Sequence, residues 1–129
     1  MDIIPIAILA SDPMTWEGSV ALLSAHPDLL ILPPELAPHA RILLVITPAV
    51  TEAVLGDMEG AQAAACCRLR IVMAADHVSP RDFVRASRAG LVGLLDRRQC
   101  GYDHIADAIK AADAMQPGAG WRTAAARHP

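Results

Sequence analysis

Short, continuous apolar runs alternate along the chain with longer segments whose apolar residues recur every three or four positions. The short runs lie at residues 3–9, 29–32, 42–46, 71–74 and 91–95. They are rich in β-branched residues and nearly uniform in hydrophobicity, which is typical of parallel strands buried on both faces. The alternation predicts an α/β fold in which helices wrap a five-stranded parallel sheet.

Four helices are expected between and after these runs. Asp12-Pro13 and Ser79-Pro80 each place a capping side chain before a proline suited to the first helical position. The helix that starts at Asp12 should stop before Pro27, and the one that starts at Ser79 should stop at Gly90. The other two helices are expected over residues 49–66 and 102–116. The positions expected to face the core are Trp16, Val20, Leu23, Val50, Val54, Met58, Ala61, Ala65, Phe83, Val84, Ser87, Ile105, Ala108, Ile109 and Ala112.

The connection over residues 33–41 breaks the alternation, because three of its nine positions are proline. Proline removes backbone donors, so a helix of useful length is not expected there. Nine extended residues still reach about 30 Å, enough to return along a short strand in a parallel sheet. Without a helix, part of the sheet and of the 49–66 helix would lose its cover. We expect Leu36 and the prolines to fold over that area, or a partner or small hydrophobic ligand to cover it.

Composition indicates one ordinary domain that binds no nucleic acid directly. The chain has 129 residues, 53% of them hydrophobic and 19% charged, so burial can offset chain entropy and wholesale disorder is excluded. A net charge of −3 argues against a domain that grips phosphate backbones.

Cysteine usage and hydropathy predict a cytoplasmic protein without a membrane partner. Cys66, Cys67 and Cys100 form neither a disulfide framework nor a zinc-ligand spacing. We interpret them as reduced, mostly buried thiols without a catalytic role. No apolar run approaches the roughly 20 residues that span a bilayer, and no basic leader precedes the first run.

Candidate chemistry is sought where the strands of a parallel sheet end, because ligands gather at that edge. The five ends are Ala10-Ser11-Asp12, Pro33-Pro34, Ile46-Thr47-Pro48, Ala75-Asp76-His77 and Asp96-Arg97-Arg98. Asp12 suits a helix cap, while Asp76-His77 and Arg97-Arg98 suit either a ligand contact or a solvated loop. No glycine-rich phosphate loop follows the first strand, and no Ser, His and Asp arrangement can be assembled from these ends.

Several stretches resemble the receiver domain of response regulators of the NarL/FixJ (LuxR-type) family, over roughly residues 3 to 116. They are Ser11-Asp12-Pro13, Trp16-Glu17-Gly18, Ala21-Leu22-Leu23, Ser87-Arg88-Ala89-Gly90, Gly93-Leu94-Leu95 and Ile105-Ala106-Asp107-Ala108-Ile109. The resemblance implies a flavodoxin-like, CheY-like doubly wound sheet of strand order 2-1-3-4-5. The helix between strands 2 and 3 would be missing or reduced to a loop. The domain would span residues 1–117, and 118–129 would be a tail or linker.

The resemblance also implies a phosphorylation site, but its positions hold other residues here. The acidic pair that holds Mg²⁺ falls on Ala10 and Ser11, and the phosphoacceptor aspartate falls on Ile46 or Thr47. The remaining positions are the hydroxyl residue after the fourth strand (Ala75), the aromatic switch (Leu94) and the lysine (Arg97, or Asp96 if the register slips). Aspartyl phosphorylation needs the carboxylate and a divalent ion. We therefore expect no catalytic residue, no metal, no cofactor and no enzyme activity.

The leading hypothesis is a phosphorylation-independent regulatory and dimerisation module of a transcription regulator. The resemblance implies a partner surface on the last two helices and the fifth strand, with opposite charges favouring a symmetric homodimer. That surface comprises Arg81, Arg85, Arg88, Asp103, Asp107 and Asp113. DNA would be bound only by a separate LuxR-type helix-turn-helix domain. Thirteen residues follow Gln116, too few for one, so we expect a chain cut at the linker or a stand-alone module.

Two alternatives remain. In the first, a small molecule occupies the former phosphorylation pocket, which Ala10, Ser11, Thr47 and Ala75 make smaller-sided and less charged than a metal site. The rim of that pocket would comprise Ser11, Asp12, Thr47, Asp76 and His77. In the second, the chain is a small flavodoxin-like enzyme, which would need a bound cofactor.

Overall fold

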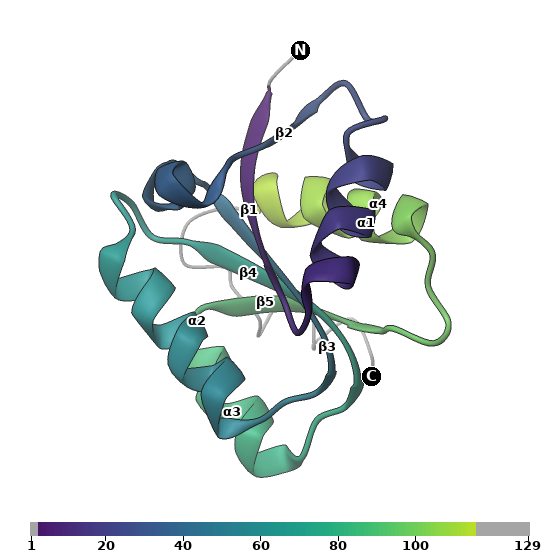
Figure 1. The fold of residues 1–129 in the computed structure, drawn as a ribbon. Helices are drawn as coiled ribbons and strands as arrows, with labels where there is room; N and C mark the ends of the chain where they lie inside the picture. The colour runs from purple at the N-terminus through teal and green to yellow at the C-terminus, as the bar shows by residue number, and fades with distance from the viewer. Residues whose placement is uncertain (1–2, 116–129) are drawn as a thin grey trace.

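Five parallel strands form one sheet in the order β2-β1-β3-β4-β5, and the computed structural model describes residues 3–115 (Figure 1). The strands are β1 (Ile4–Ala10), β2 (Leu29–Ile31), β3 (Ile42–Ala49), β4 (Arg70–His77) and β5 (Leu91–Asp96). The helices are α1 (Pro13–Leu23), α2 (Glu52–Ala64), α3 (Pro80–Ala89) and α4 (Tyr102–Asp113), with a 3₁₀ helix, η1 (Pro34–His39). The predicted fold class and strand order are therefore confirmed. The predicted domain end at residue 117 and the tail over 118–129 lie outside the described residues.

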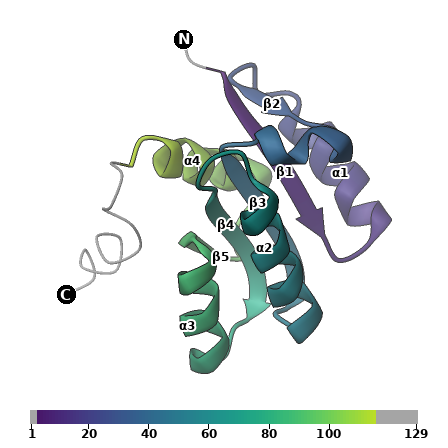
Figure 2. The same cartoon turned by 90° about the vertical axis from the view of Figure 1, so that its left-hand side faces the viewer.

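Two helical layers cover the two faces of the sheet. Alternate residues of β3 divide the core, since Leu43 and Val45 pack on one side and Leu44 and Ile46 on the other. Helices α2 and α3 lie side by side over the first face, and α1 and α4 cover the second (Figures 1 and 2). We call these the α2/α3 face and the α1/α4 face. Burial on both faces explains why the strands are continuously apolar in sequence.

The predicted helix starts at Asp12 and Ser79 are confirmed. The Asp12 carboxylate accepts a hydrogen bond from the Thr15 backbone N–H at 2.8 Å, and the Ser79 hydroxyl accepts one from the Asp82 N–H at 3.1 Å. Each satisfies an amide that the first helical turn leaves unpaired. Helix α3 ends at Ala89 and is followed by its C-cap Gly90, whose φ of 120° is a conformation that residues with side chains disfavour.

Helix α2 is shorter than predicted at both ends. It starts at Glu52 rather than Ala49, because β3 continues through Ala49, which pairs with His77 of β4. Thr51 caps it by accepting a hydrogen bond from the Val54 N–H at 3.2 Å. The helix ends at Ala64, so the following Cys66 and Cys67 lie in the loop to β4. Both cysteines are exposed and Cys100 is half-buried, so the prediction of mostly buried thiols is wrong.

The inward face of α3 also differs from the prediction. Ala86 and Ala89 are buried and Phe83 and Ser87 are half-buried, whereas Val84 is 49% exposed. The small residues Ala86 and Ala89 form the buried stripe of α3, and Val84 lies outside that stripe. The predicted stripes of α1 and α4 reach their sheet face through the buried Leu23, Ile105 and Ile109.

The connection between β2 and β3 contains no α-helix, as predicted, and only the six-residue η1 forms there. Leu36 is 44% exposed and does not cover the sheet, contrary to expectation. Pro34 and Ala37 of η1 instead border an apolar pocket of about 180 Å³ whose other walls include Leu9, Trp16 and Ala61. The shortened connection thus covers this part of the α2/α3 face incompletely.

Candidate functional site

The carboxyl ends of β1, β3 and β4 meet at one edge of the sheet, because the strands are parallel and in register. Ala10 pairs with Ile46, Thr47 pairs with Ala75, and the Ser11 N–H donates to the Ile46 carbonyl at 3.2 Å. Ala75 is also paired with Asp96, the last residue of β5. The structure therefore brings together strand-end residues for which the sequence predicts a degenerate phosphorylation site.

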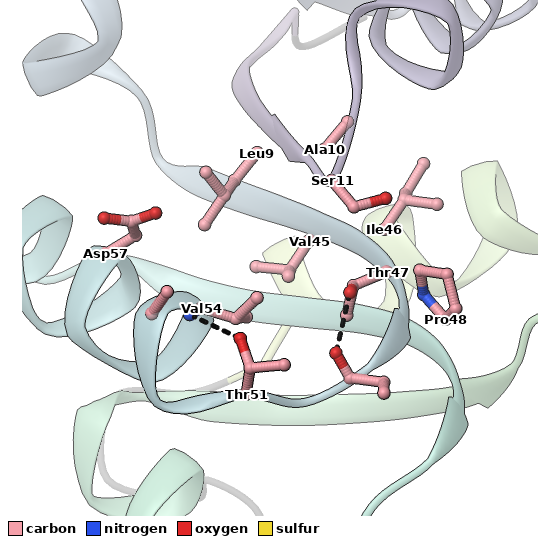
Figure 3. Close-up of a pocket in the computed structure, with 12 residues that line it drawn as sticks. Leu9, Ala10, Ser11, Val45, Ile46, Thr47, Pro48, Thr51, Val54 and Asp57 are labelled. Carbon is pink, nitrogen blue, oxygen red and sulfur yellow. Dashed lines mark hydrogen bonds between the residues drawn. The ribbon is translucent and has the colours of Figure 1, made fainter.

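A pocket of about 420 Å³ opens at this edge, between β1, β3 and the first turns of α2 (Figure 3). We call it the rim pocket. Most of its walls are apolar, with Val45, Pro48 and Val54 among them. Of the residues predicted at the degenerate positions, Ala10, Ser11, Ile46 and Thr47 line the rim pocket. Ala75 is buried on β4, where it pairs with Thr47 of β3, and it does not line the rim pocket. Arg97 lines a different pocket.

The hydroxyl groups of the rim pocket already have partners within the chain. Thr47 is 3% exposed, and its hydroxyl donates to the Ala49 carbonyl at 2.8 Å (Figure 3). The Ser11 hydroxyl donates to the Asp12 carboxylate at 3.3 Å, and Thr51 caps α2. The acceptor of the Thr47 hydroxyl is a backbone carbonyl, which cannot take up its proton, and the carboxylate beside Ser11 is already engaged by Thr15 as the α1 cap.

Asp57 is the one carboxylate among the residues that line the rim pocket, and sequence reasoning missed it. It lies on α2, one helical turn beyond Ala53 and Val54, and is exposed. No sequence signal marks Asp57, since a polar residue on the outer side of a helix is the ordinary pattern. Across residues 3–115, no group of three His, Cys, Asp or Glu side chains is arranged to hold a metal ion.

Asp12 serves as the α1 cap and does not line the rim pocket. Its carboxylate accepts hydrogen bonds from the Thr15 N–H and the Thr15 hydroxyl, each at 2.8 Å. The backbone hydrogen bond from Thr15 is the main cause that lowers the pKa of Asp12 below its ordinary value, because it stabilises the charged form. Both contacts orient the carboxylate toward the helix.

Asp76 is paired with Arg97 and is likewise not a wall of the rim pocket. The guanidinium donates two hydrogen bonds, from Nε at 3.1 Å and from Nη2 at 3.0 Å, one to each carboxylate oxygen. This two-point geometry is the strong form of an ion pair. The Arg97 hydrogen bond holds the pKa of Asp76 below its usual range, and the same bond raises the pKa of Arg97. His77 follows Asp76 and is exposed.

The six charges expected on a partner surface differ in what they contact. Arg85 pairs with Glu52 and Glu59 of α2, Asp113 pairs with Arg41 at 3.2 Å, and Asp103 lies 3.3 Å from His26. Within residues 3–115, Arg81, Arg88 and Asp107 form no ion pair. Arg81 and Arg88 lie on α3 and Asp107 lies on α4, on opposite faces of the sheet beside the edge strand β5.

Three solved structures share this fold along nearly the whole described chain. A pilus assembly-related protein from Burkholderia pseudomallei has a TM-score of 0.65 at 18% identity, covering 87% of this chain and 90% of its own. A response regulator CheY-like protein from Mesorhizobium loti has a TM-score of 0.63 at 13% identity, covering 87% of this chain and 100% of its own. The signal receiver domain of the response regulator NarL from Mycobacterium tuberculosis has a TM-score of 0.61 at 16% identity, covering 89% of this chain and 100% of its own. No family model and no curated protein sequence matches the chain.

The fold of this chain is accordingly that of CheY-like receiver domains. At identities between 13% and 18%, the likeness establishes the fold alone and not the chemistry. No helix within residues 3–115 has both the length and the apolar character needed to cross a membrane.

Proposed function

We propose that this chain is a receiver-like regulatory module that works without phosphorylation of an aspartate. The supporting observation is the composition of the rim pocket. The ends of β1 and β3 contribute Ala10, Ser11, Ile46 and Thr47, and the pocket's one carboxylate, Asp57, is on α2. A phosphoryl group is transferred to a carboxylate while a divalent ion neutralises the developing charge. The strand ends supply neither the acceptor nor the ligands for the ion.

The direct test is incubation with acetyl phosphate and Mg²⁺, followed by intact mass measurement. We expect no adduct of about 80 Da, the mass of a phosphoryl group, under conditions that label a phosphorylatable receiver. The Asp57→Asn variant is the matched control. An adduct on the wild-type chain that Asp57→Asn abolishes would assign Asp57 as an acceptor and overturn the proposal.

The module would act through self-association along α3, β5 and α4, as a homodimer. Strand β5 is an edge of the sheet, and Arg81, Arg88 and Asp107 beside it have no ionic partner within the described chain. Opposite unpaired charges on the two flanking helices suit a two-fold contact in which α3 of one copy meets α4 of the other. Arg85, Asp103 and Asp113 contribute less to this contact, because each has a partner within the chain.

Sedimentation at increasing protein concentration tests the self-association. The wild-type chain is expected to dimerise, and Arg81→Glu with Arg88→Glu to shift it toward monomer. Adding Asp107→Arg to this double variant should restore the dimer, because it exchanges the two charges. A wild-type chain that stays monomeric at high concentration would contradict the dimer.

The output of the module is proposed to be transcriptional, with DNA bound by a separate LuxR-type helix-turn-helix domain. The fold itself leaves the output open, since one of its structural neighbours is a pilus assembly-related protein and another is the receiver domain of NarL. Gel-shift measurements on the 129-residue chain should show no DNA binding, as its net charge of −3 leads us to expect.

Small-molecule sensing is a second candidate, favoured by the size of the rim pocket. Its volume of about 420 Å³ and its mainly apolar walls are those of small-ligand sites. A thermal-shift screen of small apolar metabolites tests this candidate, with Ala53→Leu as the control that narrows the pocket. A ligand whose stabilisation is lost in Ala53→Leu would support sensing at this pocket, and the absence of any stabilising compound would count against it.

A further inference from the structure

Two adjacent cysteines lie in the loop after α2, next to the end of η1. Cys66 and Cys67 are both exposed and neither is part of a disulfide. The backbone N–H of Cys66 donates to the Pro38 carbonyl at 2.8 Å, so this loop is fixed against η1. The next residue of η1, His39, is thereby held beside the first of the two thiols.

The Cys66 thiol has a potential base within reach. Its Sγ lies 3.6 Å from Nδ1 of His39, a distance typical of a hydrogen bond to sulfur. A neutral imidazole can accept the thiol proton through Nδ1, and the resulting imidazolium stabilises the thiolate. The thiolate is the nucleophilic form of cysteine, so the pair has the elements of an activated thiol.

The other two thiols lack this arrangement. The Cys67 Sγ lies 3.9 Å from the Ala40 carbonyl oxygen, an acceptor that cannot take up the thiol proton as a base would. Cys100 is half-buried, and burial together with the charge of Asp96 raises its pKa. The three thiols of the chain therefore lie in three different environments, and only the environment of Cys66 favours nucleophilic reaction of its sulfur.

The adjacency of Cys66 and Cys67 affects the product of such a reaction. Neighbouring Cα atoms are about 3.8 Å apart, which is below the roughly 4.4–6.8 Å that unstrained disulfides span. A disulfide between the two cysteines would be strained and easily reduced. An adduct on Cys66 is therefore expected to persist instead of being displaced by Cys67.

We propose that Cys66, activated by His39, is a site of reversible S-thiolation by low-molecular-weight disulfides. His39 takes the thiol proton, and the Cys66 thiolate attacks one sulfur of the disulfide. A sulfur–sulfur bond forms at Cys66 while that of the reagent breaks. The departing thiolate receives the proton from the His39 imidazolium and leaves as a thiol. No net oxidant beyond the disulfide itself is required, and an excess of free thiol reverses the step.

The test uses three versions of the 129-residue chain that each retain one cysteine, with serine at the other two positions. Each is incubated with glutathione disulfide at neutral pH, and the rate of adduct formation is measured by intact mass after acid quenching. The version that retains Cys66 should react about tenfold faster than the versions that retain Cys67 or Cys100. Equal rates for Cys66 and Cys67 would overturn the proposal.

His39→Asn separates activation by the imidazole from simple exposure of the sulfur. In the version that retains Cys66 it should slow the reaction by about threefold to tenfold. In the version that retains Cys67 it should leave the rate unchanged, which is the matched control. An unchanged Cys66 rate would remove His39 from the proposal and so refute it. Tandem mass spectrometry of the wild-type chain, which contains no substitution, must place the first adduct on Cys66.

Discussion

The two faces of the sheet differ in how completely their helices cover it. On the α1/α4 face, Arg70 donates to the carbonyls of Ala112 and Asp113, and Lys110 pairs with Asp28 at 3.1 Å. On the α2/α3 face, the short η1 replaces a full helix, and both the rim pocket and the pocket beneath η1 open there. A pocket of about 280 Å³ also opens on the α1/α4 face, beside Tyr102 and Arg97. The two faces therefore differ in the polar contacts that hold their helices and in the short η1, and not in the presence of open space.

The contrast predicts that replacing a leucine by alanine lowers the free energy of unfolding by different amounts on the two faces. Leu44→Ala removes a fully buried side chain of the α1/α4 core and should lower the free energy of unfolding by about 3–5 kcal/mol. Leu9→Ala removes a half-buried side chain that already borders both pockets of the α2/α3 face, and should cost about 1–2 kcal/mol. Urea unfolding of both variants measures the difference. Equal losses would mean that the two faces are packed alike.

Glycine replacements extend the comparison to the backbone. Gly90 has a φ of 120°, and an added Cβ would lie 2.6 Å from Nε2 of Gln62. Gly90→Ala should therefore lower the free energy of unfolding by about 1–3 kcal/mol. Gly18 of α1 has no atom within 4 Å of an added Cβ, and Gly18→Ala should raise stability by about 0.5–1 kcal/mol through helix propensity. Denaturant midpoints that move in the same direction for both variants would contradict this.

The third prediction concerns the end of α4. Nη1 of Arg70 donates to the Asp113 carbonyl at 2.8 Å, at the end of the helix, and to the Ala112 carbonyl at 3.3 Å, which also accepts from the Met115 N–H at 3.2 Å. Arg70→Met should cost about 1–2 kcal/mol and speed hydrogen exchange in the last turn of α4. Arg68→Met is the control, because Arg68 makes a single 3.5 Å contact, with the Arg88 carbonyl. Similar exchange in both variants would show that Arg70 does not hold the helix end.

Sequence patterns predicted the fold because the signals that determine it are local. Continuous apolar runs define the buried strands, Asp12 and Ser79 cap helices within three residues, and clustered prolines prevent an α-helix over η1. Each of these interactions is made with near neighbours in the chain, so it leaves a pattern that can be read without coordinates.

Contacts between elements that are distant in sequence could not be predicted from such local patterns. The Gln62 side chain amide donates to the carbonyls of Leu69 and Ala89 and accepts from the Leu69 N–H, joining α2 to the residue before β4 and to the end of α3. The position of Asp57 at the rim pocket depends likewise on how α2 lies across the sheet. Nothing near Gln62 or Asp57 in sequence marks either role, because the partners approach only after the helices pack.

The smallest effect is expected at the Asp76–Arg97 ion pair, which joins the end of β4 to the residue after β5. The Arg97 hydrogen bond lowers the pKa of Asp76 from its ordinary value of 3.8. A carboxyl group whose pKa is lowered in the folded chain stabilises the fold at pH values above its ordinary pKa. That stabilisation is lost as the pH falls through the lowered pKa. The wild-type chain should therefore lose stability as the pH decreases below about 4.

Asp76→Asn removes the titrating group and should flatten this part of the pH profile. The variant should be less stable than the wild-type chain at neutral pH, and the two should converge in acid, as followed by urea midpoints across the range. Asp107→Asn is the matched control, because Asp107 is exposed and has no ion pair within residues 3–115. A constant gap between wild type and Asp76→Asn at every pH would mean that the pairing is not electrostatic. Convergence would show that the Asp76–Arg97 ion pair contributes electrostatically to the stability of the fold.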